Sequence, residues 1–164
     1  MVKRPYFTPA SQDLPDMLLK NWVLIILHDK GAGRKRDAHS LTNEVFISVK
    51  ELLPSIEPKF EFKSECGGPY SDKVAQCVKQ LLATNMLVKK ENDSGGEGGY
   101  SYNLTKSGLE KANKIILKLP ENLRDNMSQL NFILGQMGPT GMLQYIHSIY
   151  PEYVFLRKGG ENIV

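Results

Sequence analysis

The sequence predicts a single domain of the mixed α+β class, with several helices and a small antiparallel sheet. Two observations predict this class: apolar residues recur at helical spacing in several segments, and two short strand-like runs flank a glycine-rich stretch. The length of 164 residues suits one domain, or a small domain with a helical extension. The 41% hydrophobic and 24% charged shares are typical of a globular protein and exclude wholesale disorder.

Two helices are predicted in the first third of the chain, the first over residues 16–29. Its apolar residues form one stripe at helical spacing, namely Leu19, Trp22, Val23, Ile26 and Leu27. Residues 31–33, Gly-Ala-Gly, end this helix, and residues 34–36 follow in an exposed loop. Ser40 is predicted to cap the second helix, which Pro54 stops. Its inward residues are Leu41, Val45, Val49 and Leu52 or Leu53.

A strand and a third helix are predicted next. Residues 59–63 alternate charged and aromatic side chains, which is the period of a half-buried strand. Residues 67–69, Gly-Gly-Pro, break the chain, and Ser71 or Asp72 caps a helix that runs to about Asn85. Its predicted core residues are Val74, Cys77, Val78, Leu81 and Leu82.

A hairpin is the clearest local signal. Residues 86–90 and 100–104 have the composition of strands, and four glycines within residues 91–99 predict a flexible tip. The order of helix, helix, strand, helix and hairpin is that of a winged-helix-like domain, in which three helices pack on a small antiparallel sheet whose hairpin forms the wing. In a DNA-reading helix-turn-helix, about three or four residues join the second and third helices, whereas residues 55–70 intervene here. This long join counts against a third helix placed for a major groove.

Three further helices are predicted toward the C-terminus. Thr105 caps the first, Pro120 opens the second, and residues 138–141, Gly-Pro-Thr-Gly, separate it from a third over residues 142–150. The inward residues of the first two are Leu109, Ala112, Ile116 and Leu119, then Leu123, Met127, Leu130, Leu134 and Met137. The chain is thereby divided into a flexible arm at 1–13, a winged-helix-like core at 14–105 and a C-terminal helical extension at 106–164 packed on the core.

Five short segments stand out between residues 33 and 153. They are Phe60-Glu61-Phe62, Gly68-Pro69-Tyr70-Ser71, Leu81-Leu82, Leu104-Thr105-Lys106-Ser107-Gly108 and, at residues 145–152, Tyr-Ile-His-Ser-Ile-Tyr-Pro-Glu. Their succession resembles the Panacea-domain family, also called SocA-like antitoxins. The resemblance implies a winged-helix-like fold, no catalysis, and a role as an antitoxin, a proteolytic adaptor or a regulator of gene expression. Residues 37–39, Asp-Ala-His, depart from it, because a more apolar helix entry is expected there.

The residues that commonly perform catalysis do not form a recognisable set. His28, His39 and His147 have no Ser or Cys partner in a known motif, and the carboxylates do not cluster in an apolar setting. Cys66 and Cys77 do not make a disulfide framework, and nothing around them supplies four metal ligands. We therefore expect no enzyme, no cofactor and no metal site.

The hydrophobic runs are too short for a membrane protein. The longest, residues 22–27, falls far below the roughly 18 residues needed to cross a bilayer. The basic start of the chain is followed by prolines and acidic residues where a signal peptide needs an apolar stretch. We expect a cytoplasmic protein.

A candidate nucleic-acid surface combines basic and amide side chains from three segments. They are Arg34, Lys35 and Arg36 in the first loop, Lys73, Gln76, Lys79 and Gln80 on the third helix, and Lys89 and Lys90 before the hairpin tip. Lysine and arginine contact phosphates, and Gln76 or Gln80 could bond an adenine edge. The net charge of +3 does not by itself imply nucleic acid, and phosphate would repel Asp93 and Glu97 in the tip. A solvated helix face beside a basic loop is the alternative interpretation.

The C-terminal helices raise the question of protein partners. Their apolar residues recur at heptad-like steps, which suits a homodimer through these helices. Alternatively, they pack on each other and on the first helix as an antiparallel pair turned at Pro120. We expect a non-catalytic regulator that binds double-stranded DNA. The alternative function is a protein–protein interaction module of the antitoxin or adaptor type.

Overall fold

The structure is a computed structural model, and it describes Phe7 and residues 14–28, 36–65, 67–91 and 99–153. These residues form six α-helices, two two-stranded antiparallel sheets and a final short 3-10 helix, which confirms the α+β class. Several predictions fall outside the described residues. They concern most of the N-terminal arm, Arg34, Lys35, Cys66 and the hairpin tip at 92–98.

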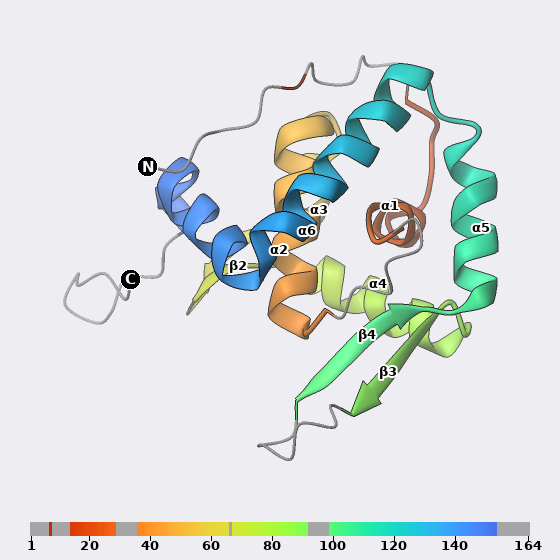
Figure 1. Ribbon diagram of the computed structural model, residues 1–164, viewed down its shortest axis with the longest axis horizontal. Coiled ribbons are helices and arrows are strands. Elements are labelled where there is room, and N and C mark those ends of the chain that lie inside the picture. Colours follow the sequence, from red (N-terminus) through yellow and green to blue (C-terminus); the bar gives the residue numbers. More distant parts are fainter. Residues whose placement is uncertain (1–6, 8–13, 29–35, 66, 92–98, 154–164) are drawn as a thin grey trace.

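Helix α1, Leu19–Ile26, lies at the centre of the molecule and is seen nearly end-on in Figure 1. It packs against α2 (Ala38–Leu52), α4 (Asp72–Ala83) and α5 (Lys106–Ile116). Every residue from 22 to 27 is buried. The prediction of a single buried stripe is therefore wrong, because other helices surround α1, and the helix is also shorter than predicted.

Helix α2 begins directly after Asp37, whose Oδ1 accepts a hydrogen bond from the backbone N–H of Ser40 at 2.7 Å. The prediction of Ser40 as the cap is wrong. Asp37 is the cap, because its carboxylate accepts from the N–H of Ser40, which has no acceptor within the helix. All the predicted core residues of α2 are buried. Phe46 and Ile47 are buried as well, since helix α6, Glu121–Ile149, packs along α2.

The long join between α2 and α4 contains a short helix and a hairpin instead of one strand. The helix is α3, Glu57–Phe60, and strands β1 (Lys63–Glu65) and β2 (Gly68–Tyr70) pair antiparallel. The predicted strand at residues 59–63 is wrong. Glu61 adopts a left-handed conformation with φ 51°, which ends α3 before the chain enters β1.

The aromatic alternation in this segment has a tertiary cause. The rings of Phe60 and Phe62 stack at 5.6 Å between centroids, and Phe62 meets the ring of Phe46 edge-on at 5.1 Å. Both phenylalanines therefore belong to one aromatic cluster, and their alternation does not reflect a strand.

The predicted third helix is confirmed as α4. The Ser71 hydroxyl accepts from the backbone N–H of Val74 at 3.1 Å and so caps the helix. Of its predicted core residues, Val74, Cys77 and Leu81 are buried, and Val78 and Leu82 are half-buried.

The predicted hairpin is confirmed as β3, Leu87–Glu91, and β4, Tyr100–Leu104, which pair antiparallel. A backbone bridge joins this hairpin to the segment before α2. The N–H of Tyr102 donates to the carbonyl oxygen of Arg36 at 2.7 Å. Three backbone segments therefore meet here: β3, β4 and Arg36. The strand predicted at residues 59–63 is not among them.

The segment Leu104-Thr105-Lys106-Ser107-Gly108 has a local structural role at the start of α5. The Thr105 hydroxyl accepts from the N–H of Gly108 at 3.0 Å and caps the helix, as predicted. A Cβ atom on Gly108 would lie 2.1 Å from the carbonyl oxygen of Met86, so only glycine allows this contact. These contacts seat the start of α5 against Met86, the residue directly before β3.

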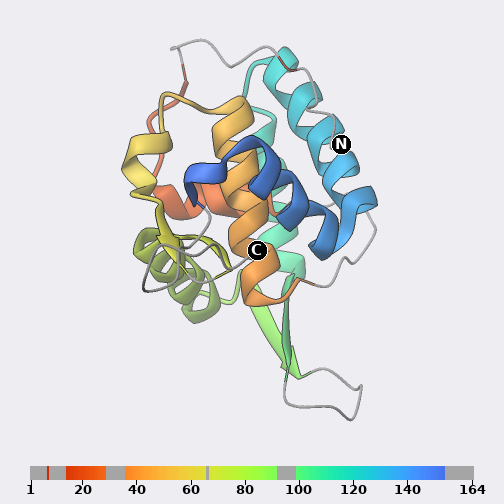
Figure 2. The ribbon, with the colours of Figure 1, turned by 90° about the vertical axis from the view of Figure 1, so that its left-hand side faces the viewer.

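Helix α6 is bent, and Figure 2 shows its two segments at an angle. The bend is at Gly138, with φ 68° and ψ 178°, directly before Pro139. The predicted break in this region is confirmed, although the second segment starts earlier than predicted. A 3-10 helix, Pro151–Tyr153, follows.

Helices α5 and α6 do not form the antiparallel pair weighed above. Helix α5 packs on α1 and α6 packs on α2, so α1 lies between them in Figure 1. Buried residues from α1 to the end of α6 belong to one hydrophobic cluster. Within the described ranges, no helix is long and apolar enough to cross a membrane.

Candidate nucleic-acid interface

The outer face of α4 presents three of the predicted contact residues to solvent. Gln76, Lys79 and Gln80 are exposed, because Val74 and Cys77 turn the opposite face of the helix toward α1. A lysine beside two glutamines can supply one phosphate contact and two amide groups for base edges. The sequence-based placement of these three residues at the surface is confirmed.

Lys73 lies at the edge of this face and is partly engaged within the protein. Its Nζ is 3.7 Å from Oε2 of Glu61, and its side chain is half-exposed. An exposed ion pair of this kind is weak in water, typically below about 1 kcal/mol. Lys73 can therefore leave Glu61 when a stronger anion is offered.

The hairpin adds two exposed lysines, Lys89 and Lys90, on β3. The Nζ of Lys89 lies 4.1 Å from the ring centroid of Tyr100, which is 45% exposed on β4. This cation–π contact holds the Lys89 ammonium beside an exposed aromatic ring. A deoxyribose could pack on that ring while the Lys89 ammonium contacts a phosphate. Lys90, the next residue of the strand, points to the opposite face of the hairpin.

These elements lie at one end of the molecule. Strand β3 packs next to α4, and both views show α4 and the β3–β4 hairpin toward the same end (Figures 1 and 2). We call the exposed residues of α4 and of the hairpin together the α4–hairpin surface: Lys73, Gln76, Lys79, Gln80, Lys89, Lys90 and Tyr100. It also includes the acids Asp72 and Glu91, which are exposed.

Arg36 is not part of the α4–hairpin surface. The prediction that it is exposed is wrong, because its side chain is only 5% exposed. Its guanidinium donates to Glu44 through Nε at 2.6 Å and through Nη2 at 3.1 Å. This two-bond pairing with a buried carboxylate satisfies the charge internally. The carbonyl oxygen of Arg36 is bound at the same time by the N–H of Tyr102 on β4.

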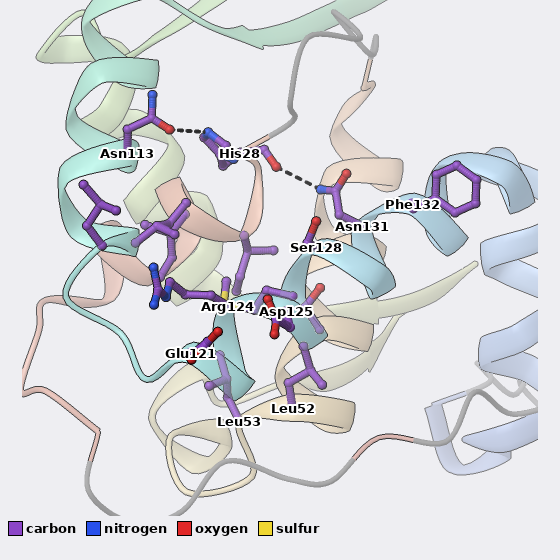
Figure 3. Close-up of a pocket in the computed structure, with 16 residues that line it drawn as sticks. His28, Leu52, Leu53, Asn113, Glu121, Arg124, Asp125, Ser128, Asn131 and Phe132 are labelled. Atoms are coloured by element: carbon purple, nitrogen blue, oxygen red, sulfur yellow. Dashed lines mark hydrogen bonds between the residues drawn. The ribbon is translucent and has the colours of Figure 1, made fainter.

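A second feature, which sequence analysis missed, is a cleft of about 660 Å³ among α1, α2, α5 and α6. His28 closes part of it (Figure 3). The ring Nε2 of His28 lies 2.8 Å from Oδ1 of Asn113 on α5, and its carbonyl oxygen accepts from Nδ2 of Asn131 on α6 at 3.0 Å. The end of α1 thus ties α5 to α6. Only the tertiary arrangement brings these three polar residues together.

The described residues offer no metal centre. No group of three or more histidine, cysteine or acidic side chains in the described ranges could hold a metal ion. Cys77 is buried against α1, and burial raises its pKa to about 11, despite the lowering effect of Lys20 and Lys73. A thiol in this state is a packing group, as the sequence predicts.

Comparisons with known proteins add no assignment. No protein-family model matches this chain, and a search of curated proteins found no match.

Proposed function

We propose that this chain is a non-catalytic regulator that binds double-stranded DNA through the α4–hairpin surface. In this proposal the fold is winged-helix-like: α1, α2 and α4 are the three helices, and β3–β4 is the wing. The observation that supports it best is the exposure of Gln76, Lys79 and Gln80 on a capped helix beside the lysines of the hairpin.

The Arg36–Tyr102 bridge also supports the winged-helix interpretation. It adds a third backbone segment to the hairpin, as a small sheet of this kind requires, and it fixes the hairpin relative to α2. The long join between α2 and α4 does not disturb α4, since Ser71 both caps α4 and donates to the carbonyl oxygen of Phe60. These two hydrogen bonds hold the start of α4, and in this proposal α4 enters a groove as a unit.

The binding is expected to be mainly electrostatic and therefore dependent on salt. Lys79, Lys89 and Lys90 would contact phosphates, while Gln76 and Gln80 would face base edges. Direct readout by a glutamine pairs its amide with adenine, which contributes about 1–3 kcal/mol of discrimination for a good bidentate contact.

The test measures the affinity for labelled random duplexes by fluorescence anisotropy across a salt series. We expect the affinity to fall as salt rises, and Lys79→Glu combined with Lys90→Glu to reduce the salt slope by about two, one for each lysine. Lys114→Glu combined with Lys118→Glu is the matched control, because it makes the same charge change at the end of α5 that is farther from the hairpin. It should leave most of the affinity intact.

Two results would contradict the proposal. One is the absence of binding at low ionic strength, and the other is an equal loss of affinity in the control and in the double variant. Either result would leave the protein–protein interaction module as the better function.

A further inference from the structure

The cleft among α1, α2, α5 and α6 has an apolar floor and an open rim. Ile25, Ile26, Leu52 and Leu53 line it and are almost fully buried. The rim includes Leu117 after α5 and Phe132 on α6, which are 71% and 68% exposed. Among the described residues, these are the two most exposed large hydrophobic side chains. Two such side chains on either side of one cleft are typical of a surface that another molecule covers.

The charges on the α5 side of the rim indicate what covers it. Lys114 and Lys118 are exposed next to Leu117, and neither forms an ion pair with a described residue. Lys111 lies one turn before Lys114 on the same helix. Glu110, one turn before Lys114, is also exposed, so this side of α5 carries three lysines and one acid. An occupant that carries carboxylates here would offset the excess positive charge.

Arg124 adds a positive group inside the cleft. Its side chain extends from α6 toward α5 (Figure 3), and its buried Nε has no hydrogen-bond acceptor among the described residues. A buried N–H without an acceptor is costly, so a carboxylate that enters beside it, after a small turn of the side chain, gains a charge-assisted hydrogen bond. The acids Glu121 and Asp125 lie on the α6 side, and they direct an acidic occupant toward α5.

We propose that this cleft docks an amphipathic, acidic segment of a partner protein. Its apolar side chains would fill the cleft between Leu117 and Phe132, and its carboxylates would face Lys114 and Lys118. A helix that lays an apolar face into a groove is a common form of such recognition. The site does not depend on DNA binding, because it lies at the end of α5 that is farther from the hairpin (Figure 1).

The test selects binders from a random library of 16-residue peptides displayed on phage, with the full chain as bait and Leu117→Ser/Phe132→Ser as the counter-selecting bait. We expect the enriched peptides to carry Leu, Phe or Trp at helical spacing, with Glu or Asp beside them. A synthetic copy of the best peptide should bind the wild-type chain and lose more than about tenfold in affinity for Phe132→Ser alone.

Charge reversal separates the apolar contact from the electrostatic one. Lys114→Glu/Lys118→Glu should weaken the binding of the peptide severalfold and reduce its salt dependence, while Lys79→Glu/Lys90→Glu, which makes the same charge change on the α4–hairpin surface, should not. Thermal unfolding of each variant checks that the chain is folded. DNA binding should be unchanged in Phe132→Ser, so a failure here is distinguishable from a failure of the proposed function.

Three results would overturn the inference. Enriched peptides without acidic residues would exclude the stated chemistry, and peptides that bind Leu117→Ser/Phe132→Ser equally well would place the contact elsewhere. A concentration-dependent dimer of the wild-type chain that Phe132→Ser converts to a monomer would assign the cleft to a second copy of this chain.

Discussion

At the scale of single residues, the environment of a charge decides its role. Arg36 and Lys79 are both basic residues of the predicted DNA surface, yet Arg36 is buried against Glu44 and Lys79 is exposed. A buried guanidinium that is already paired has no free donor edge for a phosphate. Arg36 therefore contributes to stability, and Lys79 is available for binding.

Arg36→Met is expected to lower the free energy of unfolding by about 3–5 kcal/mol, because it leaves the buried Glu44 carboxylate without its guanidinium. Urea unfolding followed by the fluorescence of Trp22 measures the change, since Trp22 is the single tryptophan and is buried. Lys63→Met, which breaks the exposed pair with Asp72, is the control and should cost less than about 1 kcal/mol. A loss in Arg36→Met no larger than in this control would contradict the interpretation.

Cys77 is expected to resist alkylation in the folded chain. In a Cys66→Ser background, iodoacetamide at pH 8 should modify Cys77 only after unfolding, because burial raises the pKa of the folded thiol to about 11. The raised pKa also means that the unfolded chain loses this proton first. Cys77 therefore makes no pH-dependent contribution to stability below about pH 9, and its deprotonation in the unfolded chain lowers the stability between pH 9 and 11. Mass spectrometry at intervals checks the labelling, and rapid modification of the folded chain would exclude a buried thiol.

At the scale of elements, helix ends and bends depend on a few local conformations. Ser71 and Thr105 cap α4 and α5 with their hydroxyl groups, and Gly138 bends α6. The conformation of Gly138, with φ 68° and ψ 178°, is essentially restricted to glycine.

Gly138→Ala is expected to cost about 1–3 kcal/mol of stability. The cost is conformational, because a Cβ atom at this position would meet nothing within 4 Å. Gln136→Ala, two residues earlier on the exposed side of α6, is the control and should change the stability by less than about 0.5 kcal/mol. Chemical denaturation of both variants measures the difference, and equal stabilities would show that the backbone accepts another conformation here.

At the scale of the whole molecule, α6 is part of the hydrophobic core. Leu123, Leu130, Leu134, Tyr145 and Ile146 of α6 belong to the same hydrophobic cluster as α1 and α2. The α4–hairpin surface and the cleft are both formed by helices that share this core. The hairpin lies at one end of α5, and the cleft lies near the other end.

A chain that ends at Leu119 is therefore expected to lose cooperative unfolding. Without α6, one side of α2 becomes exposed to solvent. Several large apolar side chains then lose their burial, which stabilises the fold by about 25 cal/mol for each Å² of apolar surface. Circular dichroism during heating should show a broad transition, and the Trp22 emission should shift to longer wavelength. Phe132→Ser in the full chain is the control, since that side chain is exposed. A sharp transition in the shortened chain would mean that residues 14–119 fold alone.

Local signals predicted those elements whose causes lie within a few residues. The caps Ser71 and Thr105, the hairpin and the break at Gly138 each depend on neighbours in sequence. The prediction of a strand at residues 59–63 was wrong, because two phenylalanines at alternate positions are compatible with a strand and with an aromatic cluster alike. The candidate site was predicted in part: its α4 residues are exposed, but Arg36 is not.

By itself, the sequence determined the α+β class, the extent of α4 and of the hairpin, and the outward position of Gln76, Lys79 and Gln80, because capping and periodicity act between near neighbours. Only the tertiary structure decided that every residue from 22 to 27 is buried, that Arg36 pairs with Glu44, and that α5 and α6 frame a cleft. These features depend on which distant segments meet, and helical or strand periodicity reports only which face of an element is apolar.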